Sequence, residues 1–213
     1  IIMNILIIGG AGFFGFNLSQ HMSKKNFKVD IIDDFSRKTS TKDIDFLKEN
    51  QNINIINGNL FELYKNNAIR NDYNIIFHFA AIVGVSNVIN QPYETLSRNI
   101  FLTDLAIKLA LMQKKLERFI FTSTSEVYSG AIERDLALIP TPENTNLIIE
   151  DSYSKRATYK LSKITGESLC LHSGLPVTIV RPHNIYGPRM GMSHVIPELI
   201  KKILFLKEGE ELD

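Results

Sequence analysis

The chain has 213 residues, of which 44% are hydrophobic and 22% charged, so it can bury a full core and we expect one α/β domain or slightly more. Its net charge of +1 and its scattered lysines predict no nucleic-acid surface, and no apolar run has the length of a membrane span. Cys170 is the single cysteine, which excludes an internal disulfide framework and a cysteine-based metal site; we expect a reducing cytoplasm and no metal.

Short apolar runs alternate with amphipathic stretches along the chain, which is the pattern of repeated βαβ units. We expect strands at residues 4–8, 29–33, 53–57, 75–79, 119–123 and 177–181. We expect helices at residues 12–24, 42–48, 61–70, 93–114, 156–172 and 194–205, and irregular structure over residues 129–154. Right-handed crossovers then predict a doubly wound parallel sheet with helices on both faces, a Rossmann fold, with ligands at the carboxyl ends of the strands.

The first expected strand runs into a glycine-rich turn and then directly into a helix, with glycines at Gly9, Gly12 and Gly15. Such a turn points backbone N–H groups of a helix N-terminus at a pyrophosphate, so it predicts dinucleotide binding. Gly15 is expected to let helix and strand pack closely. The next strand ends at Asp33, where a carboxylate would accept ribose hydroxyls and repel a 2′-phosphate, which favours NAD. The alternative is a glycine turn with a structural role alone.

A second polar group follows the fifth expected strand. Tyr159 and Lys163 are four residues apart, so they share one face of the expected helix. We expect the ammonium of Lys163 to lower the pKa of the phenol, which can then take a proton from a sugar hydroxyl while hydride leaves the same carbon. Alone, the pair would be typical of a helix surface. Its position after the glycine turn and the polar strand end Ser123–Tyr128 favours catalysis.

These motifs together resemble the extended short-chain dehydrogenase/reductase family, in particular its NAD-dependent nucleotide-sugar epimerases, dehydratases and decarboxylases. The resemblance covers nearly the whole chain and rests on the order and spacing of seven segments, which are Gly9-x-x-Gly12-x-x-Gly15, Gly58-Asn59-Leu60, His78-Phe79-Ala80-Ala81, Asn99, Ser123-Thr124-Ser125-Glu126-Val127-Tyr128, Tyr159-x-x-x-Lys163 and Arg181-Pro182-His183-Asn184-Ile185-Tyr186-Gly187-Pro188-Arg189. Asn59 departs from the aspartate that is usual in the family, although its amide oxygen can still accept from an adenine amino group.

The resemblance implies catalytic roles for Tyr159 as the base, for Lys163 on the nicotinamide ribose and for Thr124 on the hydroxyl to be oxidised, with Ser125 and Glu126 beside them. It implies that NAD is bound by Gly9, Gly12, Phe13, Phe14, Gly15, Asp33, Asp34, Asn59, Leu60, Phe79, Ala80, Ala81, Asn99, Tyr159, Lys163 and Pro182. It implies that a nucleotide sugar is bound by Ser86, Asn184 and Arg189. Outside these roles, we interpret His78 as a packed core histidine and Arg181 as a structural charge partner.

The residue after the strand-end hydroxyls, Glu126, leaves several reactions open. All begin with transient oxidation at C4 of the sugar. A 4-epimerase needs no carboxylate at this position, whereas in similar dehydratases a glutamate takes the C5 proton, and UDP-glucuronate-type decarboxylases carry a similar pattern. Glu126 can also face solvent or pair with a cation. A non-catalytic dinucleotide-binding sensor remains the alternative outside enzymes.

The resemblance also predicts how the chain is divided and assembled. We expect a dinucleotide-binding domain over residues 1–193 and the start of a truncated substrate-binding region over residues 194–213, because relatives continue into a further lobe. Relatives often dimerise through two long helices, which here would span residues 93–114 and 156–172. A homodimer held by a four-helix bundle is therefore expected.

Overall fold

The structure is a computed structural model that describes residues 3–37, 40–149, 151–191 and 194–205. In this part of the chain six parallel strands form one sheet in the order β3-β2-β1-β4-β5-β6. The strands are β1 (Asn4–Ile8), β2 (Lys28–Asp33), β3 (Ile53–Asn57), β4 (Ile75–His78), β5 (Arg118–Thr122) and β6 (Val177–Val180). The chain runs outward from β1 to β3 and then outward again from β4 to β6. The predicted doubly wound sheet is confirmed, with its switch point between β1 and β4.

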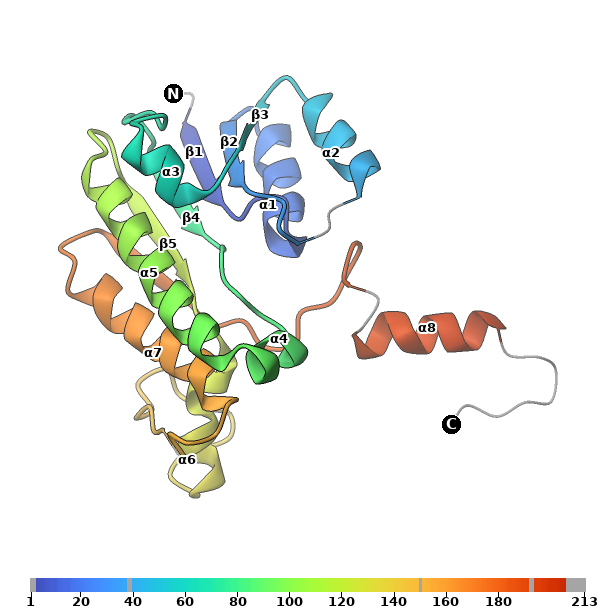
Figure 1. Cartoon of the computed structure of the whole chain (residues 1–213), viewed down its shortest axis with the longest axis vertical. Helices are drawn as coiled ribbons and strands as arrows, with labels where there is room; N and C mark the ends of the chain where they lie inside the picture. The colour runs from blue at the N-terminus through green and yellow to red at the C-terminus, as the bar shows by residue number, and fades with distance from the viewer. Residues whose placement is uncertain (1–2, 38–39, 150, 192–193, 206–213) are drawn as a thin grey trace. The chain divides into compact units, whose positions relative to one another are not determined.

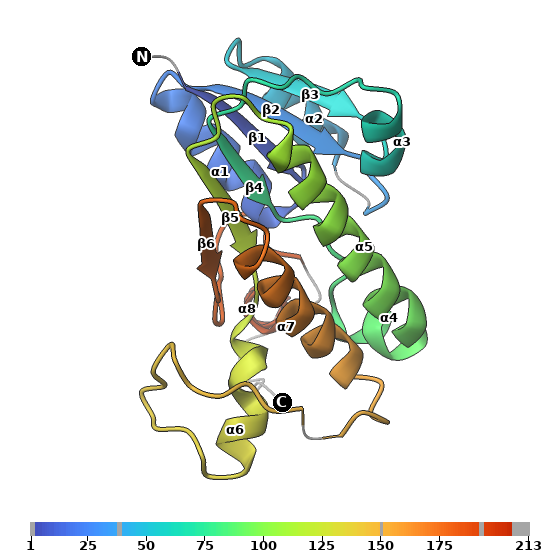
Figure 2. The same cartoon turned by 90° about the vertical axis from the view of Figure 1, so that its left-hand side faces the viewer.

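Helices cover both faces of the sheet, as predicted (Figure 1). Because side chains alternate along a strand, β1 supplies both cores: Ile5 and Ile7 pack into one, and Leu6 and Ile8 into the other. α1 (Phe13–Lys24) and α2 (Thr41–Lys48) cover the first core. The second core lies under α3 (Leu60–Lys65), α5 (Pro92–Leu111) and α7 (Ala157–Leu171), of which α5 and α7 run side by side (Figure 2).

Short elements account for the differences from the sequence prediction. The helix expected to reach residue 70 ends at Lys65, because Asn67 adopts a positive φ of 51° that a continuing helix does not allow. Three short elements were not predicted: α4 (Val85–Asn90), the 3₁₀ helix η1 (Ser125–Tyr128) and α6 (Ser129–Glu133). The helix α6 lies inside the stretch 129–154 that was expected to be irregular, so that prediction was wrong for residues 129–133. Each spans less than two turns, too few for a periodic apolar pattern.

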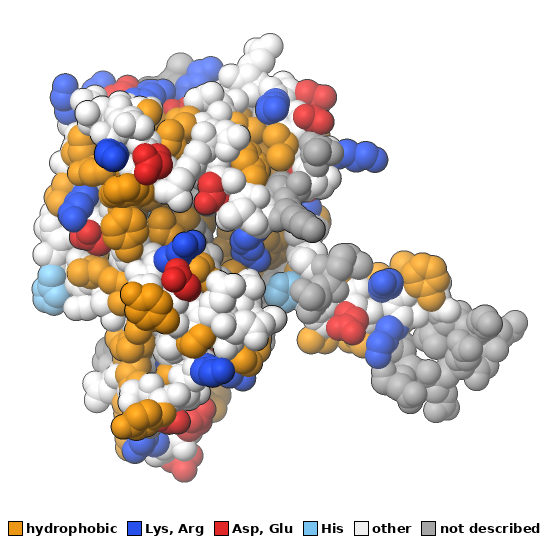
Figure 3. Space-filling model, in the orientation of Figure 1, with side chains coloured by type: hydrophobic (Ala, Val, Ile, Leu, Met, Phe, Trp, Pro, Cys, Tyr) orange, Lys and Arg blue, Asp and Glu red, His pale blue; other side chains and the backbone are white. Residues whose placement is uncertain are grey.

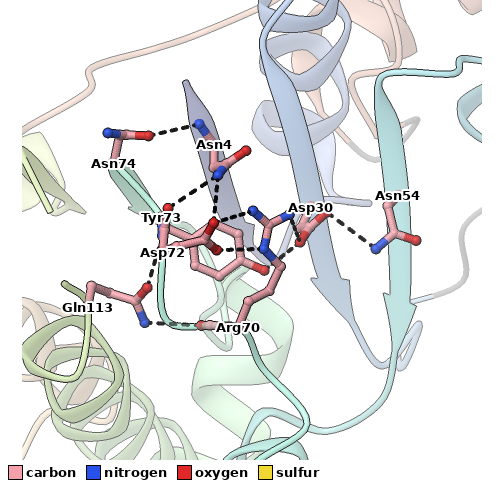
Figure 4. A network of polar contacts seen from close by, with 8 residues as sticks. All are labelled: Asn4, Asp30, Asn54, Arg70, Asp72, Tyr73, Asn74 and Gln113. Carbon is pink, nitrogen blue, oxygen red and sulfur yellow. Dashed lines mark hydrogen bonds and ion pairs between the residues drawn. The ribbon is translucent and has the colours of Figure 1, made fainter. Parts of the chain in front are cut away.

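A polar network fixes the chain where β1 and β4 begin, away from the carboxyl ends of the strands (Figure 4). The hydroxyl of Tyr73 donates to Asp30 at 2.5 Å, and the guanidinium of Arg70 donates to both carboxylate oxygens of Asp72 at 2.7 and 2.9 Å. Burial and the bond to Asp30 raise the pKa of the fully buried Tyr73 far above its ordinary value. The buried Asp30 is thus fully engaged in structure. The remaining members are Asn4, Asn54, Asn74 and Gln113.

The chain divides into two compact units, Ile1–His183 and Asn184–Asp213. The first contains the whole sheet. The second contains α8 (Val195–Phe205), whose described residues are all at least partly exposed. Residues 206–213, which the sequence analysis assigns to the start of a substrate lobe, lie outside the described residues, and the expected division after residue 193 stays a prediction. None of the described helices combines the length and apolar character needed to cross a membrane.

Candidate functional site

The glycine turn brings backbone from β1, β2 and β4 close together. Gly9 has a φ of +82°, and a Cβ there would lie 2.6 Å from the backbone nitrogen of Ala80. A Cβ on Gly15 would lie 2.4 Å from the Cα of Gly10, so the close packing predicted for Gly15 is confirmed. The N–H of Gly9 donates to the carbonyl of Ile32 at 2.8 Å. Side chains at these two glycines would force the turn apart.

The first turn of α1 is open to an anion. Among the described residues no side chain caps this helix at Gly12, and its first turn holds no acidic residue. A helix N-terminus of this kind offers N–H donors and a positive dipole end. The rings of Phe13 and Phe14 lie 5.5 Å apart, and Phe14 meets Phe79 edge to face at 5.9 Å, which fixes the turn against the end of β4. A dinucleotide pyrophosphate fits this arrangement.

Asp33 stands at the end of β2 beside the same turn. Its carboxylate accepts hydrogen bonds from the backbone N–H groups of Ala11 and Phe35, both at 2.9 Å. Burial raises the pKa of Asp33 above its ordinary value, while the two backbone bonds act against this rise. Asp34, which is exposed, accepts from the N–H of Ser36 at 3.0 Å. The geometry places the Asp33 carboxylate next to the glycine turn, where the ribose of a dinucleotide would lie.

Asn99 holds the segment that follows β4. Its amide oxygen accepts from the N–H of Ile82 at 2.7 Å, and its amide nitrogen donates to the carbonyl of Ile82 at 3.1 Å and to the hydroxyl of Ser162 at 3.3 Å. Asn99 is buried, so in this structure it acts on protein backbone. It thereby ties Ile82, which directly follows Phe79–Ala81, to α5 and α7, and its expected contact with the cofactor stays a prediction.

Four other predicted site residues serve local structure. The amide oxygen of Asn59 caps α3 by accepting from the N–H of Phe61 at 2.9 Å, and the side chain of Leu60 is buried in the core. Ser86 lies on α4, where its hydroxyl accepts from Asn90 at 3.3 Å. The carbonyl of Pro182 accepts from the N–H of Ser125 at 3.0 Å and so ties the chain after β6 to η1.

Thr124, Glu126 and Tyr159 meet at the carboxyl end of β5. The hydroxyl of Thr124 caps η1, accepting from the N–H of Glu126 at 3.3 Å, and lies close enough to the phenol of Tyr159 to influence its pKa. Burial raises the pKa of Tyr159 to about 12, the negative charge of Glu126 adds to this, and the hydroxyl of Thr124 acts against it. The exposed Glu126 is therefore close enough to act on the phenol electrostatically.

Lys163 is oriented differently from the prediction. Its ammonium is buried, donates to the carbonyl of Thr122 at 2.7 Å, and lies 5.9 Å from the centre of the Tyr159 ring and 5.1 Å from that of Phe121. Burial lowers its pKa to about 8. The expectation that Lys163 lowers the pKa of Tyr159 is wrong for this structure, because the ammonium faces a strand carbonyl and the dominant influences on the phenol are burial and Glu126.

Two residues set aside by the sequence analysis are indeed structural. Burial lowers the pKa of His78 to about 3, so the ring is neutral at ordinary pH, and it packs against the rings of Phe119 and Phe121. Arg181 forms a two-pronged ion pair with the buried Glu167, at 2.8 and 2.6 Å. Both interpretations are confirmed.

Sequence reasoning missed the polar contacts that support this edge. Ser123 donates to Glu167, and Lys160 donates to the hydroxyl of Ser129 at 2.6 Å. A lysine next to the expected base was visible in the sequence, but its partner is 31 residues away. No periodic signal links positions at that separation.

The remaining substrate candidates, Asn184 and Arg189, belong to the second unit. Arg189 has a φ of +73°, and partial burial lowers its pKa. Of the other candidates, the glycine turn, Asp33, Phe79–Ala81 and Thr124–Glu126 directly follow or end strands of the first unit, whereas Ser86, Asn99, Tyr159 and Lys163 lie on helices. In the described part of the chain, no group of three His, Cys, Asp or Glu side chains forms a possible metal site.

Known proteins are similar to this chain in sequence and in fold. The chain is 34% identical over 213 residues to the UDP-N-acetyl-alpha-D-glucosaminuronate decarboxylase of Bacillus cytotoxicus, a match that covers 97% of the chain and 62% of that protein. It is 31% identical over 216 residues to the dTDP-D-glucose 4,6-dehydratase of Dictyostelium discoideum, a match that covers 95% of the chain and 48% of that protein. The solved structure of an NAD dependent NDP-hexosamine 5,6-dehydratase, TunA, superposes with a TM-score of 0.76 at 25% identity. The superposition covers 95% of this chain and 62% of TunA.

The chain spans less than two thirds of the length of each of these relatives. The model of the NAD dependent epimerase/dehydratase family matches residues 5–212, which is nearly all of the chain. The family match, the parallel sheet and the glycine turn agree with one another. The chain therefore belongs to the NAD dependent epimerase/dehydratase family.

Proposed function

We propose that this chain is the NAD-binding and catalytic part of an enzyme that modifies a nucleotide sugar through transient oxidation at C4. The observation that carries the proposal is the position of Tyr159 and Lys163 on one face of α7, where the ammonium lies 5.9 Å from the phenol ring and bonds the last residue of β5, in the same unit as the glycine turn and Asp33. The family match and the resemblance to a solved NAD dependent dehydratase support it.

The residues fit NAD in two places: the N–H groups in the first turn of α1 would hold the pyrophosphate, and Asp33 would accept the adenine ribose hydroxyls. Lys163 would hold the nicotinamide ribose only by exchanging its present bond to the carbonyl of Thr122 for bonds to the ribose hydroxyls. Bound NAD would accept the hydride from C4. Tyr159 would take the proton from the C4 hydroxyl, and Thr124 would hydrogen-bond that hydroxyl. Ser125 would stand beside these groups at the start of η1.

Glu126 decides which reaction follows. Its influence on the pKa of Tyr159 supports a carboxylate that faces the reaction site. After oxidation at C4, such a carboxylate can take the C5 proton, as dehydration requires, or assist loss of carbon dioxide from a glucuronate. A relative at 34% identity is a decarboxylase and one at 31% is a dehydratase, so both branches are retained beside 4-epimerisation.

A Glu126→Gln substitution tests these branches. It keeps size and hydrogen bonding but removes the base, so in a dehydratase the ketosugar and reduced cofactor should accumulate. In a 4-epimerase the variant should turn over nearly normally. Solvent deuterium gives a second measurement, because C5 proton abstraction brings label into the product and 4-epimerisation does not. Carbon dioxide release from a UDP-glucuronate substrate would select the decarboxylase.

The non-catalytic alternative is tested with the wild type. Purified protein, in the longest natural form of the chain, is mixed with NAD and then with UDP- and dTDP-linked sugars. Transient absorbance of reduced nicotinamide is the expected result. Tight NAD binding with neither reduction nor product from any of these sugars would favour a sensor and contradict the enzyme.

The assembly and the substrate contacts belong to the same proposal. Ser86, Asn184 and Arg189 would contact the nucleotide sugar. The homodimer would form through α5 and α7, and hydrophobic side chains are exposed over this side of the first unit (Figure 3). On the two helices the exposed apolar side chains include Tyr93, Phe101, Leu111 and Leu171. The dimer and a cytoplasmic location stay predictions.

A further inference from the structure

A chain of hydrogen bonds links α7 to the segment that carries Glu126. Lys160 follows Tyr159 directly and is only 8% exposed. Its ammonium donates to the hydroxyl of Ser129 at 2.6 Å, and that hydroxyl donates to the backbone carbonyl of Glu126 at 2.9 Å. A buried ammonium is costly unless it is well hydrogen-bonded. The contact between Lys160 and Ser129 therefore constrains where η1 lies against α7.

Glu126 is held by its backbone on both sides. Its N–H donates to the hydroxyl of Thr124 at 3.3 Å, and its carbonyl accepts from Ser129. Its side chain is exposed, so core packing does not fix the carboxylate. The carboxylate is carried by the backbone of η1, which packs on α7. Thr124, at the other end of this short segment, is close enough to Tyr159 to influence the pKa of the phenol.

We propose that Lys160 and Ser129 are positioning residues that hold Glu126 beside the hydroxyl of Tyr159. The proposal deepens the function above, since it explains how a carboxylate on an exposed 3₁₀ segment is kept next to the base. Because Lys160 and Tyr159 are neighbours on one helix, the contact with Ser129 ties the Glu126 segment to the backbone that also carries the base. Neither Lys160 nor Ser129 is required to touch the substrate.

The titration of Tyr159 reports the position of Glu126. After burial, the charge of Glu126 from η1 is the main influence that raises the pKa of the phenol. The other charged groups on α7 are Lys163, which donates to the carbonyl of Thr122, Glu167, which pairs with Arg181, and Lys160 itself. Moving the carboxylate away should therefore lower the pKa of Tyr159. A substitution that only loosens the fold elsewhere would not change the pKa of Tyr159 in a way that depends on the presence of the Glu126 carboxylate.

The experiment uses the full protein with fluorotyrosine at position 159, whose ring fluorine lowers the intrinsic pKa and is followed by ¹⁹F NMR. The pKa is measured in the parent protein, in Ser129→Ala, in Glu126→Gln and in the double variant. We expect each single variant to lower the pKa and the double variant to fall no further than Glu126→Gln alone. Ser129→Thr, which retains the hydroxyl, should keep the parent value.

A matched control is Ser173→Ala. Ser173 donates to the carbonyl three residues earlier, that of Cys170 at 2.6 Å, just as Ser129 does to Glu126, but it stands after the far end of α7. This variant should leave the titration of the phenol unchanged. An unchanged pKa in Ser129→Ala overturns the proposal. A further fall of equal size in the Glu126→Gln background, or an equal fall in Ser173→Ala, overturns it as well.

Lys160 is tested by difference, because Lys160→Met also removes a cation. Its effect on the pKa of Tyr159 is measured in the parent and in the Glu126→Gln background. In the Glu126→Gln background, Lys160→Met changes the pKa of Tyr159 only through the loss of the cation. In the parent protein the substitution should also displace the Glu126 carboxylate, so the pKa there should come out lower than the change measured in the Glu126→Gln background would give. Equal effects would remove Lys160 from the proposal. These titrations need no substrate, so a failure of the proposed enzymatic function would be seen separately, as absent cofactor reduction.

Discussion

Arg181→Met should destabilise the protein strongly. The guanidinium pairs with the carboxylate of Glu167 at 2.6 Å, and the two side chains are 19% and 4% exposed. Removing one partner of a buried pair typically costs about 3–5 kcal/mol, because the other charge is left in a low-dielectric site. Since Arg181 is partly solvated, we expect a loss near the lower end, about 3 kcal/mol. Arg181 also donates to the hydroxyl of Tyr128 at 2.6 Å and to the carbonyl of Glu143 at 2.8 Å.

Urea unfolding of a double-mutant cycle measures this cost. Glu167→Gln should cost less than Arg181→Met, because the arginine it leaves behind keeps its other contacts and some solvent. The double variant should be more stable than Arg181→Met alone, because no buried charge remains. Arg98→Met is the control: its pair with Glu94 joins side chains that are 68% and 43% exposed, and such pairs contribute about 0.3–0.5 kcal/mol. A loss below about 1 kcal/mol for Arg181→Met would refute the reasoning.

Three further predictions concern the site. Asp33→Ala should weaken NAD binding and reduce the preference for NAD over NADP, measured by titration of both cofactors; tighter NADP binding by the wild type would contradict this. Tyr159→Phe should lower turnover by about 10²- to 10⁴-fold while sparing NAD affinity, since the ring remains and the proton acceptor is lost. Lys163 has its pKa lowered from 10.5 to about 8, so the unfolded chain binds more protons in that window. The free energy of unfolding of the wild type should therefore rise with pH between these values relative to Lys163→Met, and equal slopes would argue against the buried ammonium.

The sheet could be predicted from the sequence because each strand is an apolar run with a turn signal at its end. The expected strands 4–8 and 53–57 match β1 and β3 at both ends. The four others differ by one residue at one or both ends. In a parallel sheet covered on both faces, burial requires apolar side chains at nearly every position, so the signal is strong. The short α4 and α6 carry no such signal and were missed.

The candidate site was predictable in its parts but not in its contacts. The positions of Gly9, Asp33 and Tyr159 follow from motif spacing, because strand ends of a parallel sheet share one edge. The direction of the Lys163 ammonium depends on the carbonyl of Thr122, which is 41 residues away in the chain. The electrostatic effect of Glu126 on the phenol likewise requires η1, a 3₁₀ turn that periodicity does not detect.

The raised pKa of Tyr159 has two opposite effects on the proposed oxidation at C4: it lowers the fraction of phenolate and raises the strength of each phenolate as a base. A pKa of about 12 means that few molecules carry the phenolate at neutral pH, but each phenolate is a stronger base. The negative charge of Glu126 stabilises the protonated form of Tyr159, which is the form present after the phenolate has taken the substrate proton. Proton uptake by Tyr159 removes the repulsion between the two groups, and the carboxylate of Glu126 would then be available as the base of the next step. The same carboxylate would then promote completion of C4 oxidation and carry out the chemistry that follows it, an order that 4-epimerisation alone does not need.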